Sequence, residues 1–124
     1  MKKNIVLLIT LILIICTVFP AAALSEEDLK DLKVALVLPS TKNDYAFSQS
    51  MYESLLKLGF KEENISVSES LGDATAAEEA IRDYAEDNDI VIAHGSQYGS
   101  KIQTLAADYP ETVFAWGNGV DTYD

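Results

Sequence analysis

The chain has 124 residues, enough for one domain. It carries 20 acidic and 9 basic residues, which gives a net charge of −11. Loss of an N-terminal segment that contains Lys2 and Lys3 would leave 20 acidic and 7 basic residues, a net charge of −13. A surface this negative repels nucleic-acid phosphates and anionic lipid headgroups, so the composition excludes nucleic acid as a partner.

The N-terminus has the three parts of a secretory signal peptide. A basic start, MKKN, precedes an apolar run (residues 5–19) and the small residues AAA, which predict cleavage after Ala23. A retained membrane anchor is the alternative, because the apolar run counted through Leu24 approaches the roughly 20 residues that span a bilayer. Ile15 disfavours lipidation of Cys16, since that processing needs a small residue before the cysteine. We therefore expect a signal peptide at residues 1–23, a charged lead-in at 24–32 and an extracytoplasmic location.

Cys16 is the only cysteine of the chain. Cleavage after Ala23 would leave a mature chain without a thiol. An internal disulfide, a thiolate metal site and thiol catalysis are then excluded.

The first predicted elements are a strand and a helix. Residues 33–38 (KVALVL) form an apolar run without alternation, which is typical of a strand buried on both faces. Residues 44–58 repeat apolar side chains at helical spacing, and Gly59 stands where a helix would end. We expect the buried face of this helix to consist of Phe47, Met51, Leu55 and Leu58.

The second strand is predicted at residues 65–69 (ISVSE), near an edge of the sheet because its apolar residues alternate with polar ones. Thr75 and Glu78 have the spacing of a capping box, which predicts the start of the next helix. Its expected buried positions are Ala77, Ile81, Tyr84 and Ala85.

The third strand, at residues 89–95 (DIVIAHG), again reads as buried on both faces. The next predicted element is a helix, which ends at Pro110, and residues 112–117 (TVFAWG) are predicted to form the fourth strand. The order βαβαβαβ predicts an α/β fold in which a parallel sheet carries helices on both faces. The apolar positions of the third helix are Ile102, Leu105, Ala106 and Tyr109.

The candidate ligand-binding residues follow from the topology, because ligands of open parallel sheets lie beyond the carboxyl ends of the strands. A nucleoside or sugar needs an aromatic ring to stack on, with amide and carboxylate groups for its hydrogen bonds. Such groups occur at Asn43, Asp44, Phe47, Ser48 and Gln49 after the first strand, Ser96 and Gln97 after the third, and Asn118 and Asp121 after the fourth.

Each of these residues also has a structural interpretation. Phe47 lies on the predicted core face of its helix as well as near the ligand edge, and the sequence favours neither role. Asp44 is suited to be a helix N-cap. Asn118 and Asp121 are equally suited to form turns, and Tyr98 has no evident structural duty.

Catalytic patterns are incomplete. A nucleophile elbow requires G-x-S-x-G, and Ser96 directly follows Gly95. The single histidine, His94, is expected to bond to the backbone at its strand end, since no carboxylate partner is fixed by the sequence. Metal-ligand spacing and a phosphate-binding loop are missing. We therefore expect no catalytic residue, no metal and no cofactor.

A family resemblance is carried by three stretches: KVALVLPSTKNDYAFSQSMYESLLKLG, AEEAIRDYAEDNDIVIAHGSQYG and YPETVFAWGNGVDTYD. Together they resemble the basic membrane protein family of substrate-binding proteins of ABC importers. The resemblance implies a type I periplasmic-binding fold with two α/β lobes. Residues 33–124 would be the incomplete N-terminal lobe, because the family runs to roughly three times this length.

The resemblance also implies roles for single residues. The acidic residue placed like Asp44 hydrogen-bonds a purine base, and the aromatic residue placed like Phe47 stacks on it. The family commonly has Asn where this chain has Ser48. An Asp beyond the fourth strand binds the ribose hydroxyls, and Asn118 and Asp121 are the nearest matches.

The expected function is that of a non-enzymatic solute-binding component that serves an ABC permease and binds a nucleoside-like small molecule. One alternative is an extracytoplasmic ligand-sensing domain that its N-terminal segment tethers to the membrane. Another is a small hydrolase-like enzyme that uses His94 or Ser96.

Overall fold

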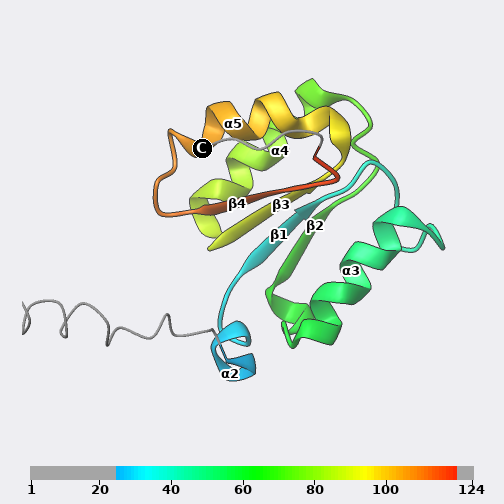
Figure 1. Cartoon of the computed structure of the whole chain (residues 1–124), viewed down its shortest axis with the longest axis vertical. Coiled ribbons are helices and arrows are strands. Elements are labelled where there is room, and N and C mark those ends of the chain that lie inside the picture. Colours follow the sequence, from blue (N-terminus) through cyan, green and yellow to red (C-terminus); the bar gives the residue numbers. More distant parts are fainter. Residues whose placement is uncertain (1–24, 120–124) are drawn as a thin grey trace, which may run out of the picture.

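A four-stranded parallel sheet lies at the centre of the computed structural model, which describes residues 25–119 (Figure 1). The strand order is β2-β1-β3-β4, and each neighbouring pair is parallel. The predicted α/β class is therefore confirmed. The strands are β1 (Val34–Val37), β2 (Ile65–Ser68), β3 (Ile90–His94) and β4 (Val113–Gly117); the helices are α2 (Glu26–Leu29), α3 (Phe47–Leu58), α4 (Ala74–Asp87) and α5 (Gly99–Ala106), with 3₁₀ turns η1 (Glu62–Asn64) and η2 (Ser96–Tyr98).

The central strand, β1, is completely buried along its length. Its first residue, Val34, is in register with Ile65 of β2 on one side and Ile90 of β3 on the other. This explains the unbroken apolar run in the sequence. The strand β2 pairs only with β1 among the described strands and is partly exposed, as its alternating pattern predicted.

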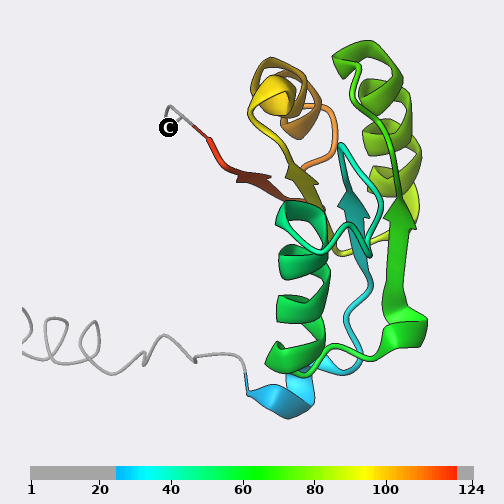
Figure 2. The same cartoon turned by 90° about the vertical axis from the view of Figure 1, so that its right-hand side faces the viewer.

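Helices cover both faces of the sheet. Helices α4 and α5 lie on one face and α3 on the other, an arrangement visible in both views (Figures 1 and 2). On the first face Ala35 and Val37 pack in one apolar cluster with Ile81 of α4 and Leu105 of α5. On the second face a cluster contains Val34, Leu36, Leu38, Tyr52, Leu55 and Phe60.

The buried face of α3 differs from the prediction. The helix begins at Phe47, three residues later than expected, and its buried residues are Ser48, Tyr52 and Leu55. Leu58 is 56% exposed, so its expected place on the buried face was wrong. Phe47, for which the sequence left a core role and a ligand role open, is 40% exposed and belongs to neither core cluster. Gly59 ends the helix as predicted, with a left-handed φ of 105° that glycine tolerates best.

The start of α4 corrects a second prediction. Its N-cap is Asp73, whose carboxylate accepts hydrogen bonds from the N–H groups of Thr75 (2.9 Å) and Ala76 (3.0 Å), so Thr75 does not form the expected capping box. Glu78 instead pairs with Lys101 of α5 at 2.6 Å. The expected buried positions of α4 are confirmed, with Tyr84 only partly buried.

This cap gives a first testable prediction. Replacing Asp73 with alanine removes the acceptor for two N–H groups and should lower the free energy of unfolding by about 1 kcal/mol. Thr75→Ala is the control, because it leaves the cap in place. Urea unfolding with an unchanged m-value measures both variants. An equal loss in both would contradict the Asp73 cap.

Two further elements differ from the sequence prediction. The charged lead-in contains the short helix α2, capped by reciprocal hydrogen bonds between Ser25 and Asp28. Helix α5 ends at Ala106, well before Pro110, and Ala106 is exposed. The predicted signal peptide (residues 1–23) lies outside the described residues.

Candidate ligand-binding site

The carboxyl ends of β1, β3 and β4 lie on one edge of the sheet, because the three strands are parallel and adjacent. His94, the last residue of β3, is in register with Gly117, the last residue of β4. The segments that follow these strands carry all the candidate residues predicted from the sequence. One of these candidates, Asp121, lies outside the described residues 25–119.

Asp44 fixes the turn that leads into α3. Its Oδ1 accepts hydrogen bonds from the backbone N–H groups of Ala46 (2.9 Å) and Gln49 (3.1 Å), and its Oδ2 from that of Ser48 (3.2 Å). The N-cap residue of α3 is Ala46, so the interpretation of Asp44 as the N-cap was wrong by two positions. From outside the helix, the Asp44 carboxylate still serves the N–H groups of the first turn. Partial burial raises the pKa of Asp44, but these hydrogen bonds outweigh it and hold the pKa below its ordinary value.

The turn itself places an aromatic residue in solvent. Tyr45 has a positive φ of 58°, which is uncommon for a residue with a side chain, and 93% of it is exposed. Its N–H donates to Oε1 of Gln49 at 2.9 Å, and the Gln49 amide group donates to Glu53 at 2.7 Å. The side chain of Gln49 thus holds the turn. Asn43, before the turn, is exposed.

Phe47 contacts His94 instead of the core. The two rings are stacked, with centroids 3.7 Å apart and planes 15° from parallel. The Nε2 of His94 also lies 3.2 Å from the main-chain oxygen of Phe47, so His94 bonds to the backbone as the sequence predicted. Sequence reasoning missed that His94 also stacks on Phe47.

Ser48 lies directly beneath this turn and is completely buried. Its hydroxyl has no hydrogen-bond partner among the described residues. It is close enough to the Asp44 carboxylate to help lower its pKa, although the contact falls short of hydrogen-bond geometry. The predicted candidate Ser48 therefore sits inside the turn rather than on its surface.

The segment after β3 combines exposed and buried residues. Ser96 and Gln97 are exposed, whereas Tyr98 is completely buried and its hydroxyl donates to the main-chain oxygen of Leu71 at 2.5 Å. Tyr98 therefore anchors η2 to the segment after β2, a structural duty that its sequence context did not reveal. Asn118, after β4, is exposed and has a φ of 64°, which is typical of a turn.

Trp116 supports η2 from the neighbouring strand. Its Nε1 donates to the main-chain oxygen of Gly95 at 2.8 Å. Its ring lies so close to Gly99 that a Cβ there would come within 2.5 Å of it. Glycine at position 99 is what allows this approach. The sheet edge near Ser96 and Gln97 is thus held by fixed backbone contacts.

The titration of His94 gives a second testable prediction. Burial lowers the pKa of His94 from 6.5, while the hydrogen bond to Phe47 and the charge of Asp44 act in the opposite direction. As the pH falls, the unfolded chain therefore takes up this proton at a higher pH than the folded chain. The contribution of His94 to the free energy of unfolding is complete above about pH 6.5 and is lost as the pH falls toward the lowered pKa.

His94 is the single histidine of the chain, so it is the side chain expected to titrate at pH values just above those of the carboxyl groups. We expect the free energy of unfolding to fall between about pH 7 and 5 in the wild type and less in His94→Gln. Urea unfolding at several pH values measures it. Parallel pH profiles for the two proteins would refute this assignment.

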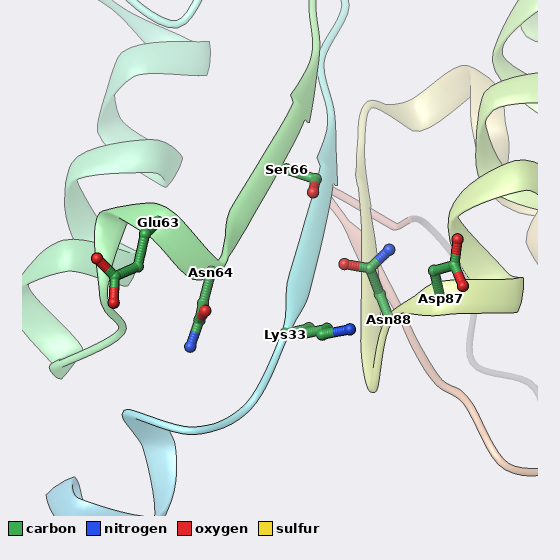
Figure 3. Close-up of a pocket in the computed structure, with 6 residues that line it drawn as sticks. All are labelled: Lys33, Glu63, Asn64, Ser66, Asp87 and Asn88. Atoms are coloured by element: carbon green, nitrogen blue, oxygen red, sulfur yellow. The ribbon is translucent and has the colours of Figure 1, made fainter.

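Two hollows lie at the opposite, amino-terminal edge of the sheet. One, of about 210 Å³, is lined by six polar residues (Figure 3): Lys33, Glu63, Asn64, Ser66, Asp87 and Asn88. Its two amide groups are already used, since Asn64 donates to the main-chain oxygen of Lys30 (2.8 Å) and Asn88 to that of Tyr84 (2.9 Å). The second hollow, of about 430 Å³, shares Lys33, Asp87 and Asn88 with the first. We interpret both hollows as gaps between the segments that pack around the amino-terminal ends of the strands, and not as ligand sites.

The described residues contain neither a metal-binding cluster nor a membrane-spanning helix. No group of three or more His, Cys, Asp or Glu side chains within residues 25–119 has an arrangement that could hold a metal ion. In the same range no helix is long and apolar enough to cross a bilayer.

Comparisons with known proteins agree with this fold. The chain is similar to an ABC transporter solute-binding protein from Conexibacter woesei DSM 14684, with 30% sequence identity and a TM-score of 0.59 over 67% of this chain. The chain spans 28% of the length of that protein. It shares its fold with a lipoprotein fragment from Peptoclostridium difficile 630, at 24% identity and a TM-score of 0.57, covering 76% of this chain and 77% of that one.

No curated protein matches the chain. The Bmp family, described as ABC transporter substrate-binding protein PnrA-like, matches residues 31–124, which is most of the chain. The parallel sheet and the order of its elements fit that match. The chain therefore belongs to the Bmp family of PnrA-like ABC transporter substrate-binding proteins.

Proposed function

We propose that the chain forms one wall of an extracytoplasmic solute-binding site that serves an ABC permease, and that the solute is a nucleoside or a similar small polar molecule with a flat ring. The observation that carries this proposal is the ring of Phe47. It is stacked on His94 and still 40% exposed, at the carboxyl edge of the sheet. An aromatic ring backed on one side and open to solvent is a suitable platform for a base.

The position of the ring supports the same interpretation. Binding sites of open parallel sheets lie beyond the carboxyl ends of the strands, and Phe47 lies there at the start of α3. Family membership independently indicates a substrate-binding protein. The hollows at the amino-terminal edge lack an aromatic lining residue, so they suit a base less well.

Asp44 can contribute a hydrogen bond to the ligand while it caps α3. A carboxylate oxygen has two lone pairs. Oδ1 of Asp44 accepts two backbone hydrogen bonds, whereas Oδ2 accepts one, from Ser48. Oδ2 therefore has room for one further hydrogen bond, for which an N–H or O–H group of the ligand would compete with the nearby Ser48 hydroxyl. Further polar groups on this edge are the exposed side chains of Asn43, Ser96, Gln97 and Asn118.

The location and the partner follow from the family and from the N-terminal sequence. Substrate-binding proteins of ABC transporters deliver their solute to a membrane permease, and the predicted signal peptide would export the chain to the same side of the membrane. His94 is bonded to the Phe47 backbone and stacked on its ring, a structural role that provides no support for the hydrolase alternative.

The proposal is tested by an NMR titration of the ¹⁵N-labelled chain with guanosine, inosine and glucose. NMR is chosen because it detects affinities down to about 1 mM, which a single wall of a site would give. We expect the nucleosides to shift the amide signals of Asp44, Phe47 and Gln97, with glucose as the control. Shifts confined to Asn64 and Asn88, or no shift with any nucleoside, would contradict the proposal.

A further inference from the structure

His94 holds Phe47 at two points. Its ring lies flat against the Phe47 ring at 3.7 Å, and its Nε2 lies 3.2 Å from the main-chain oxygen of the same residue. The stack restrains the tilt of the Phe47 ring, and the hydrogen bond restrains the backbone that carries it. The last residue of β3 is thus tied to the first turn of α3.

The hydrogen bond fixes which nitrogen of His94 carries the proton. A carbonyl oxygen only accepts, so Nε2 must donate, and in the neutral ring Nδ1 then has a free lone pair. Nδ1 is buried and has no hydrogen-bond partner among the described residues. The histidine as a whole is only 7% exposed.

Strand β4 also contacts the His94 ring, through Gly117. A Cβ built on Gly117 would collide with Nδ1 of His94, so glycine at this position leaves room for the imidazole. His94 is therefore enclosed between the Phe47 ring and the Gly117 backbone. The position of the Phe47 ring depends on a fit that spans α3, β3 and β4.

We propose that His94 is a positioning residue for the ligand: its neutral form holds the Phe47 ring in place for stacking, and protonation of His94 releases the ring and weakens binding. This inference rests on the proposed function of Phe47 as the ligand platform. It concerns a residue that would act through Phe47, without a ligand contact of its own.

The chemistry of Nδ1 is the reason for the dependence on protonation. A second proton would create an N–H donor at Nδ1, buried beside Gly117 with no acceptor in the described structure. From the turn before α3 the Asp44 carboxylate favours the charged form, while burial of the ring opposes it and lowers the pKa of His94. Gly117, on β4, adds no charge.

The test combines three variants and one control, with guanosine as the probe between about pH 5 and 7.5. His94→Phe keeps a ring beneath Phe47 but cannot titrate. His94→Ala removes the ring, and Gly117→Ala displaces it. Gly72→Ala is the control, because a Cβ there meets nothing within 4 Å.

We expect the affinity of the wild type to fall as His94 titrates, with the midpoint that the NMR signal of its Cε1 proton gives. His94→Phe keeps the stack but loses the hydrogen bond to the Phe47 oxygen, so at high pH its affinity should lie between those of the wild type and His94→Ala, and it should show no such fall. His94→Ala and Gly117→Ala should bind about threefold to tenfold more weakly, the range measured for aromatic pairs. Gly72→Ala should match the wild type.

Unchanged affinity in His94→Ala, or wild-type affinity that stays constant while His94 titrates, would overturn the inference and leave the proposed function standing. If guanosine does not bind the wild type at any pH, the proposed function fails instead. The Phe47 ring signals of the free protein then decide the inference. They should move with the titration of His94 and in His94→Ala, and constant signals would overturn it.

Discussion

Replacing Leu36 with alanine should lower the free energy of unfolding by about 2–5 kcal/mol, the range found for buried leucines. Leu36 is completely buried in β1 and packs with Tyr52 and Leu55 of α3. Removing three carbon atoms there leaves a cavity between the sheet and the helix. The neighbouring strands hold the backbone on both sides, which limits the collapse of that cavity.

Leu58→Ala is the matched control. Leu58 also belongs to α3, but it is 56% exposed, so the same substitution should change stability by less than about 1 kcal/mol. Urea unfolding followed by circular dichroism measures both. If Leu58→Ala cost as much as Leu36→Ala, the register of α3 on the sheet would be wrong.

Replacing Phe47 with alanine should weaken nucleoside binding by about 1–3 kcal/mol, the range found for stacking of a base on an aromatic side chain. Because Phe47 is partly exposed and outside the two core clusters, we expect its loss to affect stability much less than binding. Binding is measured by NMR or calorimetry and stability by urea unfolding.

Two variants make this prediction sharper. Phe47→Trp offers a larger platform and should retain binding. Tyr45→Ala removes the neighbouring aromatic side chain, which is 93% exposed and is not stacked on another ring in the described structure. If Tyr45→Ala weakened binding and Phe47→Ala did not, the ligand would stack on Tyr45, and the site would have to be moved to the turn.

Much of the fold could be predicted because its signals are local. The unbroken apolar run of β1 reflects burial on both faces, and the alternation of β2 reflects its place at the edge. In β3 the run overstated the burial, because Ile90 and Ile92 are only partly buried. Gly59 marked the end of α3 because a left-handed residue is needed there. These local patterns, together with the alternating order of strands and helices, predicted the fold class and hence the edge of the sheet where the candidate residues lie.

The register of α3 could not be predicted in the same way. Asp44 caps the helix from outside it, so the helix begins at Phe47 rather than at Asp44. The buried face consequently includes Ser48 and Tyr52, and the most apolar residue of the first turn is left at the surface. A polar side chain such as Ser48 in a core position gives no periodic signal.

The partner of Phe47 is equally invisible to local reasoning. His94 lies 47 positions away in the chain and reaches Phe47 only because β3 is adjacent to β1 in the sheet. The burial of Tyr98 likewise depends on Leu71, from another part of the chain. Such contacts require the topology, which the sequence predicts, and the packing, which it does not.

The most direct measurement is a set of intermolecular nuclear Overhauser effects between the base protons of bound guanosine and the aromatic side chains of the chain. We expect contacts from the base to the ring protons of Phe47, at the carboxyl edge of the sheet. Contacts to Tyr45 or Trp116 without Phe47, or to Asn64 and Asn88 at the opposite edge, would contradict it.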